Sequence, residues 1–138
     1  MQDANYKMMK TNKQLIGIDL FAGAGGLSLG AEMAGISMRY AVEADAYAAA
    51  SYKRNFKNAT VFCEDIRKLS ADKLNTQPVF IIMGGPPCQG FSLSNTKTRD
   101  MSNPNNRMFE EFLRFVDKIA PTWFVFENVY GLTKFKNG

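Results

Sequence analysis

Histidine is absent from the 138-residue chain, and cysteine occurs only twice. Without histidine there can be no histidine-based triad or general base, and most types of zinc site are excluded. Cys63 and Cys88 stand in unlike settings without a Cys-x-x-Cys spacing, so neither a disulfide framework nor a metal cluster is predicted. We therefore expect a reducing, cytoplasmic location and no metal. Any acid or base must be Asp, Glu, Lys, Tyr or Cys.

Long apolar runs are also missing. No segment approaches the roughly 20 apolar residues of a membrane span. Residues 1–14 are polar and are predicted to be a disordered lead-in, not a signal peptide. The composition, with 46% hydrophobic and 22% charged residues, is typical of a globular protein. We therefore expect one folded domain over residues 15–138. Its net charge of +4 mildly favours a polyanionic partner.

Apolar runs alternate with helix-forming segments along the chain. The sequence predicts strands at residues 15–21, 38–42, 60–62, 79–83 and 123–126, and helices from the first glycine turn to residue 34, at 46–55 and at 108–119. Residues 66–69 are weakly helical, and residues 90–106 form a long polar loop. Because the strands show no in/out alternation, we expect an α/β fold with a parallel sheet covered on both faces. Ligands bind such sheets at the carboxyl ends of the strands.

A dense glycine turn, F-A-G-A-G-G-L-S-L-G, follows the first predicted strand. Ser28 stands where a dinucleotide fingerprint has its third glycine, so another adenosine-bearing cofactor is favoured. Glu43 follows the second strand and is placed to take ribose hydroxyls. The turn could also be a tight connection with nothing bound, and Glu43 a solvated charge. Asp65, after the third strand, is read most simply as a helix N-cap.

The fourth predicted strand runs into G-G-P-P-C-Q-G-F-S at residues 84–92. Two glycines allow the turn and two prolines stiffen it, which would hold Cys88 in a fixed place as a nucleophile. A free cysteine can equally be a small apolar filler of the core. The fifth strand runs directly into Glu127 and Asn128, so acidic groups and a thiol gather at one predicted sheet edge.

Three blocks carry a resemblance to a known family: D-L-F-A-G-A-G-G-L at 19–27, G-P-P-C-Q-G-F-S at 85–92 and E-N-V at 127–129. In this order and at these separations they resemble the cytosine carbon-5 DNA methyltransferases. The resemblance runs from about residue 16 to residue 129. It implies the Rossmann-like sheet of S-adenosylmethionine-dependent methyltransferases, with strands one to five and their helices present and the carboxyl-terminal end incomplete. Residues 15–138 would then be a partial catalytic domain that uses S-adenosylmethionine.

The resemblance also implies roles for individual residues. Phe21 and the glycines would line the methionine end of the cofactor, Glu43 would hold the ribose, and Asp65 would reach the adenine amine with Ile66 on the ring. The full set of implied cofactor residues is Asp19, Phe21, Ala22, Gly23, Gly25, Gly26, Leu27, Glu43, Asp65, Ile66, Gly85, Pro86 and Met108. The family often has an aromatic residue where this chain has Ala44, usually Leu in place of Met108, and commonly Arg in place of Asn105.

The chemistry of the family assigns the remaining roles. Carbon 5 of cytosine is a poor nucleophile, so a thiolate must first add to carbon 6, and Cys88 would supply it. Glu127 would act in its protonated form on the cytosine ring, and Asn128 would fix the local geometry. The residues implied to contact double-stranded DNA around a flipped base are Gln89, Ser92, Lys97 and Arg99.

The family's later blocks, including a Gln-x-Arg segment and a target-recognition region, are missing from this chain. We therefore expect a chain that is inactive alone and needs its missing part, on the same or a second polypeptide. Two alternatives stay open at this point. One is a non-catalytic, cofactor-binding half of a split or regulatory assembly, and the other is an enzyme that methylates tRNA.

Overall fold

A computed structural model describes residues 14–74, 78–87 and 107–128 of the chain. Several predictions made from the sequence lie outside these residues. Two predicted segments are affected, the lead-in apart from residue 14 and the polar loop. The predicted nucleophile, Cys88, and the residues predicted to contact DNA, Gln89, Ser92, Lys97 and Arg99, also lie outside the described part. The sheet, its helices and the other candidate residues lie within the described part.

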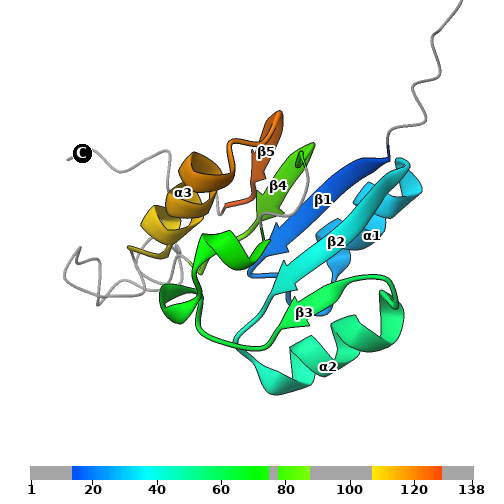
Figure 1. The fold of residues 1–138 in the computed structure, drawn as a ribbon. Helices are drawn as coiled ribbons and strands as arrows, with labels where there is room; N and C mark the ends of the chain where they lie inside the picture. Colours follow the sequence, from blue (N-terminus) through cyan, green and yellow to red (C-terminus); the bar gives the residue numbers. More distant parts are fainter. Residues whose placement is uncertain (1–13, 75–77, 88–106, 129–138) are drawn as a thin grey trace, which may run out of the picture.

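Five strands form one parallel sheet in the order β3-β2-β1-β4-β5 (Figure 1). The strands are β1 (Leu15–Leu20), β2 (Ile36–Val42), β3 (Thr60–Phe62), β4 (Ile81–Gly84) and β5 (Trp123–Phe126). The chain winds outward from β1 to β3 and then returns to the other side of β1 for β4 and β5. The strand order therefore reverses between β1 and β4, which is where doubly wound sheets bind ligands.

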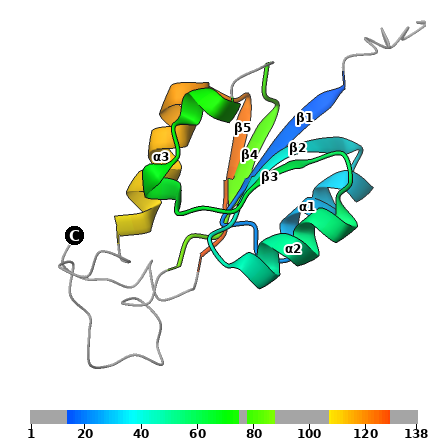
Figure 2. The ribbon, with the colours of Figure 1, turned by 60° about the horizontal axis from the view of Figure 1, so that its bottom comes forward.

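The helices cover both faces of this sheet. They are α1 (Gly26–Met33), α2 (Ala46–Asn55) and α3 (Met108–Ile119), with short 3-10 helices η1 (Ile66–Lys68) and η2 (Ala71–Leu74). Figure 2 shows α1 and α2 on one face and α3 with the two 3-10 helices on the other. The larger core lies under α3, whose Phe112 and Phe115 are fully buried against Ile18, Leu20 and Ile82. Arg114 of α3 donates to the backbone carbonyls of Ile66 and Leu69, at 2.8 and 3.2 Å, and so ties α3 to η1.

Most predicted elements are confirmed, with small shifts at their ends. α2, β3, α3 and β5 have the predicted bounds, and the Asp45 carboxylate caps α2 by accepting from the Ala48 N–H at 2.8 Å. β2 begins two residues earlier than predicted, and β4 covers residues 81–84, not 79–83. The predicted first strand is one residue too long, because Phe21 leaves it with a left-handed φ of 59°. η2 was not predicted.

One row of residues marks the carboxyl ends of all five strands. Leu20 pairs with both Val42 and Gly84, Val42 pairs with Phe62, and Gly84 pairs with Phe126. The residue after each member of this row therefore stands at the same edge of the sheet. These next residues are Phe21, Glu43, Cys63, Gly85 and Glu127. The parallel register thus collects an aromatic ring, a thiol and two carboxylates at one edge.

Candidate functional site

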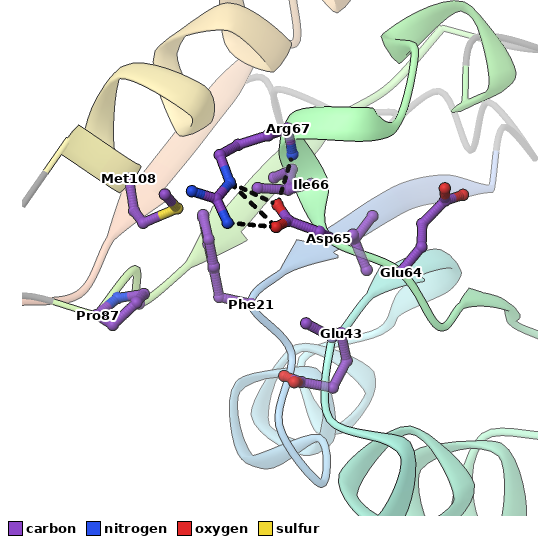
Figure 3. Close-up of a pocket in the computed structure, with 11 residues that line it drawn as sticks. Phe21, Glu43, Glu64, Asp65, Ile66, Arg67, Pro87 and Met108 are labelled. Atoms are coloured by element: carbon purple, nitrogen blue, oxygen red, sulfur yellow. Dashed lines mark hydrogen bonds and ion pairs between the residues drawn. The ribbon is translucent and has the colours of Figure 1, made fainter. Parts of the chain in front are cut away.

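A cavity of about 380 Å³ opens at this edge of the sheet, within the size range of small-molecule sites. Its walls come from the ends of β1 to β4, from η1 and from the first residue of α3 (Figure 3). Phe21, Ile66 and Met108 supply apolar surface, and Glu43, Glu64, Asp65 and Arg67 supply charge. The cavity therefore combines apolar walls with a few polar groups.

The Glu43 carboxylate is held in place by two backbone N–H groups. Its Oε2 accepts from the Gly23 N–H at 2.8 Å, and its Oε1 accepts from the Asp45 N–H at 2.7 Å. The first bond joins the end of β2 to the glycine turn after β1. Because each oxygen keeps a free lone-pair site, the carboxylate can still accept hydrogen bonds from a ligand's hydroxyl groups.

The glycine turn leaves space above its backbone. A side-chain carbon built on Gly23 or Gly26 would meet nothing within 4 Å, so a ligand can approach the main chain there. Gly25 has a φ of 101°, and a side-chain carbon on it would lie 2.2 Å from the Phe56 ring, so the turn also requires glycine for packing. Phe21 has a left-handed φ, which is uncommon outside glycine, and its side chain lines the cavity.

Asp19 lies beneath this turn and not in the cavity. It is 1% exposed, and its Oδ2 accepts a hydrogen bond from the Ser28 hydroxyl at 2.6 Å. Ser28 is also 2.6 Å from the Tyr52 hydroxyl of α2. Burial raises the pKa of Asp19 to about 6, although the Ser28 hydroxyl and N–H partly oppose this. Asp19 therefore joins β1, α1 and α2 through a buried polar cluster.

Asp65 caps η1, as the sequence suggested, and is also paired with Arg67. The Arg67 N–H and side chain both donate to its carboxylate. These hydrogen bonds lower the pKa of Asp65 to about 2, so it is ionised at neutral pH. Figure 3 shows the Arg67 side chain folded back over Asp65 toward Met108. Both residues line the cavity.

Gly85 and Glu127 are neighbours because β4 pairs with β5. The Glu127 N–H donates to the Gly84 carbonyl at 3.0 Å, which continues the β4–β5 ladder past the last strand residue. A side-chain carbon on Gly85 would lie 2.3 Å from Glu127 Oε2. The glycine therefore leaves the room in which the Glu127 carboxylate lies, beside the segment that leads to residue 88.

The structure brings together part of the cofactor set predicted from the sequence. The predicted residues that line the cavity are Phe21, Glu43, Asp65, Ile66, Gly85 and Met108. The predicted residues outside its lining are Asp19, Ala22, Gly23, Gly25, Gly26, Leu27 and Pro86, of which Ala22 packs in the core under α2 and Leu27 is exposed. The lining residues outside the predicted set are Val42, Ala44, Glu64, Arg67 and Pro87, of which the sequence analysis had noted Ala44 only as a departure from the family. A signal existed for Arg67, because a residue two positions after a capping Asp can donate to it.

The residues present fit S-adenosylmethionine. The cavity offers a carboxylate oriented by two N–H groups for hydroxyl groups, apolar walls for a ring, and glycines that leave open space beside the main chain. A parallel sheet in the order β3-β2-β1-β4-β5 with these features at its carboxyl edge defines a Rossmann-like domain for an adenosine-bearing cofactor.

Comparison with known proteins narrows this class to one family. Residues 15–138 match the family model described as C-5 cytosine-specific DNA methylase, and the chain belongs to that family. Members of the family use S-adenosylmethionine as methyl donor.

Similar proteins include bacterial Type II methyltransferases. The chain is 46% identical over 121 residues to the Type II methyltransferase M.DdeI of Desulfomicrobium norvegicum, covering 86% of this chain and 29% of that protein. It is 43% identical to the Type II methyltransferase M.XorII of Xanthomonas oryzae pv. oryzae, with the same two coverages. A prophage-encoded E. coli protein described as a DNA modification methyltransferase aligns with a TM-score of 0.76 and 38% identity, covering 89% of this chain and 34% of that one. The chain thus spans about a third of the length of these relatives.

The described residues hold neither a metal-binding cluster nor a membrane-spanning helix. Within them, no group of three or more His, Cys, Asp or Glu side chains could hold a metal ion. None of the described helices has both the length and the apolar character needed to cross a membrane.

Proposed function

We propose that this chain carries the cofactor-binding and nucleophile-bearing part of a DNA (cytosine-5)-methyltransferase that acts on double-stranded DNA. The observation that carries the proposal is the Glu43 carboxylate, oriented by the N–H groups of Gly23 and Asp45 at the mouth of the cavity. Membership of the family supplies the reaction class. The type II enzymes among its relatives favour a role in restriction and modification.

In this proposal the cavity holds S-adenosylmethionine. Glu43 accepts hydrogen bonds from the ribose hydroxyls, Asp65 accepts one from the adenine amine, and Ile66 packs on the ring. Phe21 and the open glycine turn line the methionine end, and Met108 touches the cofactor from the start of α3. The bound cofactor supplies an electrophilic methyl group on its sulfonium.

The chain's own reacting groups are Cys88 and Glu127. The Cys88 thiolate adds to carbon 6 of a cytosine flipped out of the duplex, which opens the 5,6 double bond and makes carbon 5 nucleophilic. Glu127, in its protonated form, hydrogen-bonds ring nitrogen 3 and stabilises the charge that develops there. After methyl transfer a base removes the carbon 5 proton and the thiolate leaves. Asn128 fixes the geometry beside Glu127, and the DNA-contacting residues are Gln89, Ser92, Lys97 and Arg99.

We further propose that the 138 residues alone do not methylate DNA and need the remaining part of the domain. The support is the length of the chain, which spans about a third of its relatives. A second support lies on β5, where Trp123, Phe124 and Val125 are 63%, 55% and 45% exposed. Exposed apolar side chains on neighbouring positions are typical of a surface that another segment covers.

Binding of S-adenosylmethionine to the chain tests the first part. We expect Glu43→Gln to weaken it at least tenfold, because the new amide nitrogen would face a backbone N–H donor and disturb the carboxylate position. Glu32→Gln, an exposed change on α1, is the matched control and should leave the dissociation constant within twofold. Absence of S-adenosylmethionine binding, or equal binding by both variants, would contradict the proposed cofactor site.

Covalent trapping tests the second part. With S-adenosylmethionine present and a complementing segment from a relative that supplies the missing blocks, 5-fluorocytosine DNA should form a denaturant-stable adduct with the chain, because the fluorine on the methylated carbon 5 cannot leave as a proton does. Cys88→Ala should abolish the adduct, whereas Cys63→Ala should retain it, since Cys63 is the other cysteine of the chain. An adduct that still forms in Cys88→Ala would refute the assignment of Cys88 as the nucleophile. Trapping on RNA but not on DNA refutes the DNA substrate, and methylation by the 138 residues alone refutes the need for a second part.

A further inference from the structure

The Asp65 carboxylate is fully engaged by one residue, Arg67. Its Oδ1 accepts from the Arg67 backbone N–H at 3.0 Å and from Nε at 2.9 Å. Its Oδ2 accepts from Nε at 3.0 Å and from Nη2 of the same guanidinium. The single Nε hydrogen is shared between the two oxygens, so three N–H donors of Arg67 surround the carboxylate and each oxygen accepts from two of them. A ligand amine that approaches from the side of the guanidinium therefore competes with it for these oxygens.

The pair lies in the wall of the cavity and remains open to water. The side chains of Arg67 and Asp65 are 48% and 28% exposed, and both residues line the cavity. Figure 3 shows the guanidinium on the cavity side of Asp65, between it and Met108. Exposed ion pairs are weak, because water and salt screen them, so this pair can open at small cost. The backbone bond from the Arg67 N–H can remain when the side chain moves away.

We propose that Arg67 is a specificity-determining competitor: its guanidinium occupies the hydrogen-bonding positions of Asp65 that a ligand amine needs, and it must swing aside before adenine binds. This inference rests on the proposed adenosine site. In the ligand-free chain Arg67 keeps Asp65 paired. Binding of adenine exchanges that ion pair for the amine's hydrogen bond.

The competition has a chemical signature. Adenosine carries an amine on carbon 6 of its ring, whereas purine riboside has only a hydrogen there. Only adenosine has to displace the guanidinium, so only adenosine is penalised by it. Removal of the Arg67 side chain should therefore strengthen the binding of adenosine and leave the binding of purine riboside unchanged. A purely steric or overall electrostatic role of Arg67 would change both nucleosides alike.

The test measures equilibrium binding of adenosine and purine riboside to the full chain and its variants. We expect Arg67→Ala to lower the dissociation constant of adenosine about fivefold and to leave that of purine riboside within twofold. The affinity of Arg67→Lys for adenosine should lie between those of the unchanged chain and Arg67→Ala, because an ammonium lacks the planar fork of donors. Lys68→Ala, which removes the same charge from the next residue of η1, should leave both nucleosides unchanged. Unaltered thermal unfolding would show that each variant is folded.

Several results overturn the inference. Adenosine that binds Arg67→Ala equally or more weakly refutes competition, and so does an equal gain for both nucleosides or a gain in Lys68→Ala. Loss of adenosine binding in Glu43→Gln, together with no effect of Arg67→Ala, would leave the cofactor site standing and remove only the competitor. If neither the chain nor any variant bound adenosine, both the site and the competitor would be refuted.

Discussion

Replacement of Ser28 by alanine tests the buried cluster beneath the glycine turn. The Ser28 hydroxyl has one proton, which it donates to Asp19 Oδ2 at 2.6 Å, so the Tyr52 hydroxyl donates to Ser28 when Asp19 is ionised. Ser28→Ala removes a partner from both neighbours at once. Asp19, Ser28 and Tyr52 are at most 1% exposed, so water does not replace the lost hydroxyl without rearrangement.

The expected loss of stability follows from the two broken bonds. A buried polar group left without its partner costs about 1–3 kcal/mol, and more if it is charged. We therefore expect Ser28→Ala to lower the free energy of unfolding by about 3 kcal/mol at pH 7.5. This is a large part of the roughly 5–15 kcal/mol that stabilises a domain. It should appear as a clear shift of the urea midpoint.

The loss should also depend on pH, in a direction fixed by Asp19. Its pKa is raised to about 6 from an ordinary 3.8, so the folded state holds this proton more tightly than the unfolded chain. The contribution of Asp19 to stability is therefore present below pH 4 and is lost as the pH rises to about 6. Ser28→Ala removes a bond that favours the ionised form and raises this pKa further. At pH 5 Asp19 is mostly protonated in both proteins, so this part of the cost disappears. A rise of about one unit in the pKa is worth about 1.4 kcal/mol, so the loss of stability caused by Ser28→Ala should fall from about 3 kcal/mol at pH 7.5 to about 1.5 kcal/mol at pH 5.

Urea unfolding followed by circular dichroism at pH 5 and pH 7.5 measures both effects. Ser51→Ala is the matched control on α2, because its hydroxyl is exposed and donates to the Tyr47 carbonyl of the same helix at 3.0 Å. It should change stability by less than about 0.5 kcal/mol at either pH. A Ser28→Ala loss no larger than that of the control, or one independent of pH, would refute the assignment of a buried, proton-linked cluster.

Two further predictions concern packing around the sheet. A side-chain carbon on Gly84 would lie 2.2 Å from the Leu20 carbonyl oxygen, so Gly84→Ala should cost about 3 kcal/mol in urea unfolding, whereas Gly30→Ala in open space on α1 should stabilise by about 0.5–1 kcal/mol. A neutral result for Gly84→Ala would contradict the close β1–β4 register. Arg114→Ala removes two hydrogen bonds to backbone carbonyls around η1 and should cost about 2 kcal/mol. Arg107→Ala, which removes an exposed ion pair with Glu110 on the same helix, should cost under about 0.5 kcal/mol. Equal losses from the two arginine variants would contradict the anchoring role of Arg114.

Local patterns in the sequence were sufficient to predict the sheet and its edge. The strands are short apolar runs bounded by polar residues, and in a parallel sheet their ends must meet on one side, so the position of Glu43 could be predicted before its contacts were known. The same reasoning did not predict the backbone conformation of Phe21, which was expected to continue the first strand. A left-handed φ at a bulky residue is set by the turn as a whole and has no local signature.

Contacts that depend on exact register or on packing between helices could not be predicted. Ser28 was seen only as a break in a glycine pattern, because its bond to Tyr52 joins residues that are 24 positions apart on two helices. The contact of Gly85 with Glu127 requires the β4–β5 register, which no local pattern determines. Arg67 was missed for a different reason. The Arg67 guanidinium folds back onto Asp65, the residue that caps η1. In the sequence, the charge of Arg67 alone did not distinguish it from the exposed Lys68 beside it.

The position of Trp123 makes β5 an optical reporter. It is the single tryptophan of the chain, it is the first residue of β5, one of the two edge strands of the described sheet, and it is 63% exposed. Its indole should therefore emit as a water-exposed fluorophore in the isolated chain. Any segment that covers this strand would move the indole into an apolar environment and shift its emission to shorter wavelength. Coverage of β5 by such a segment can thus be followed by intrinsic fluorescence, without a label and without an activity assay.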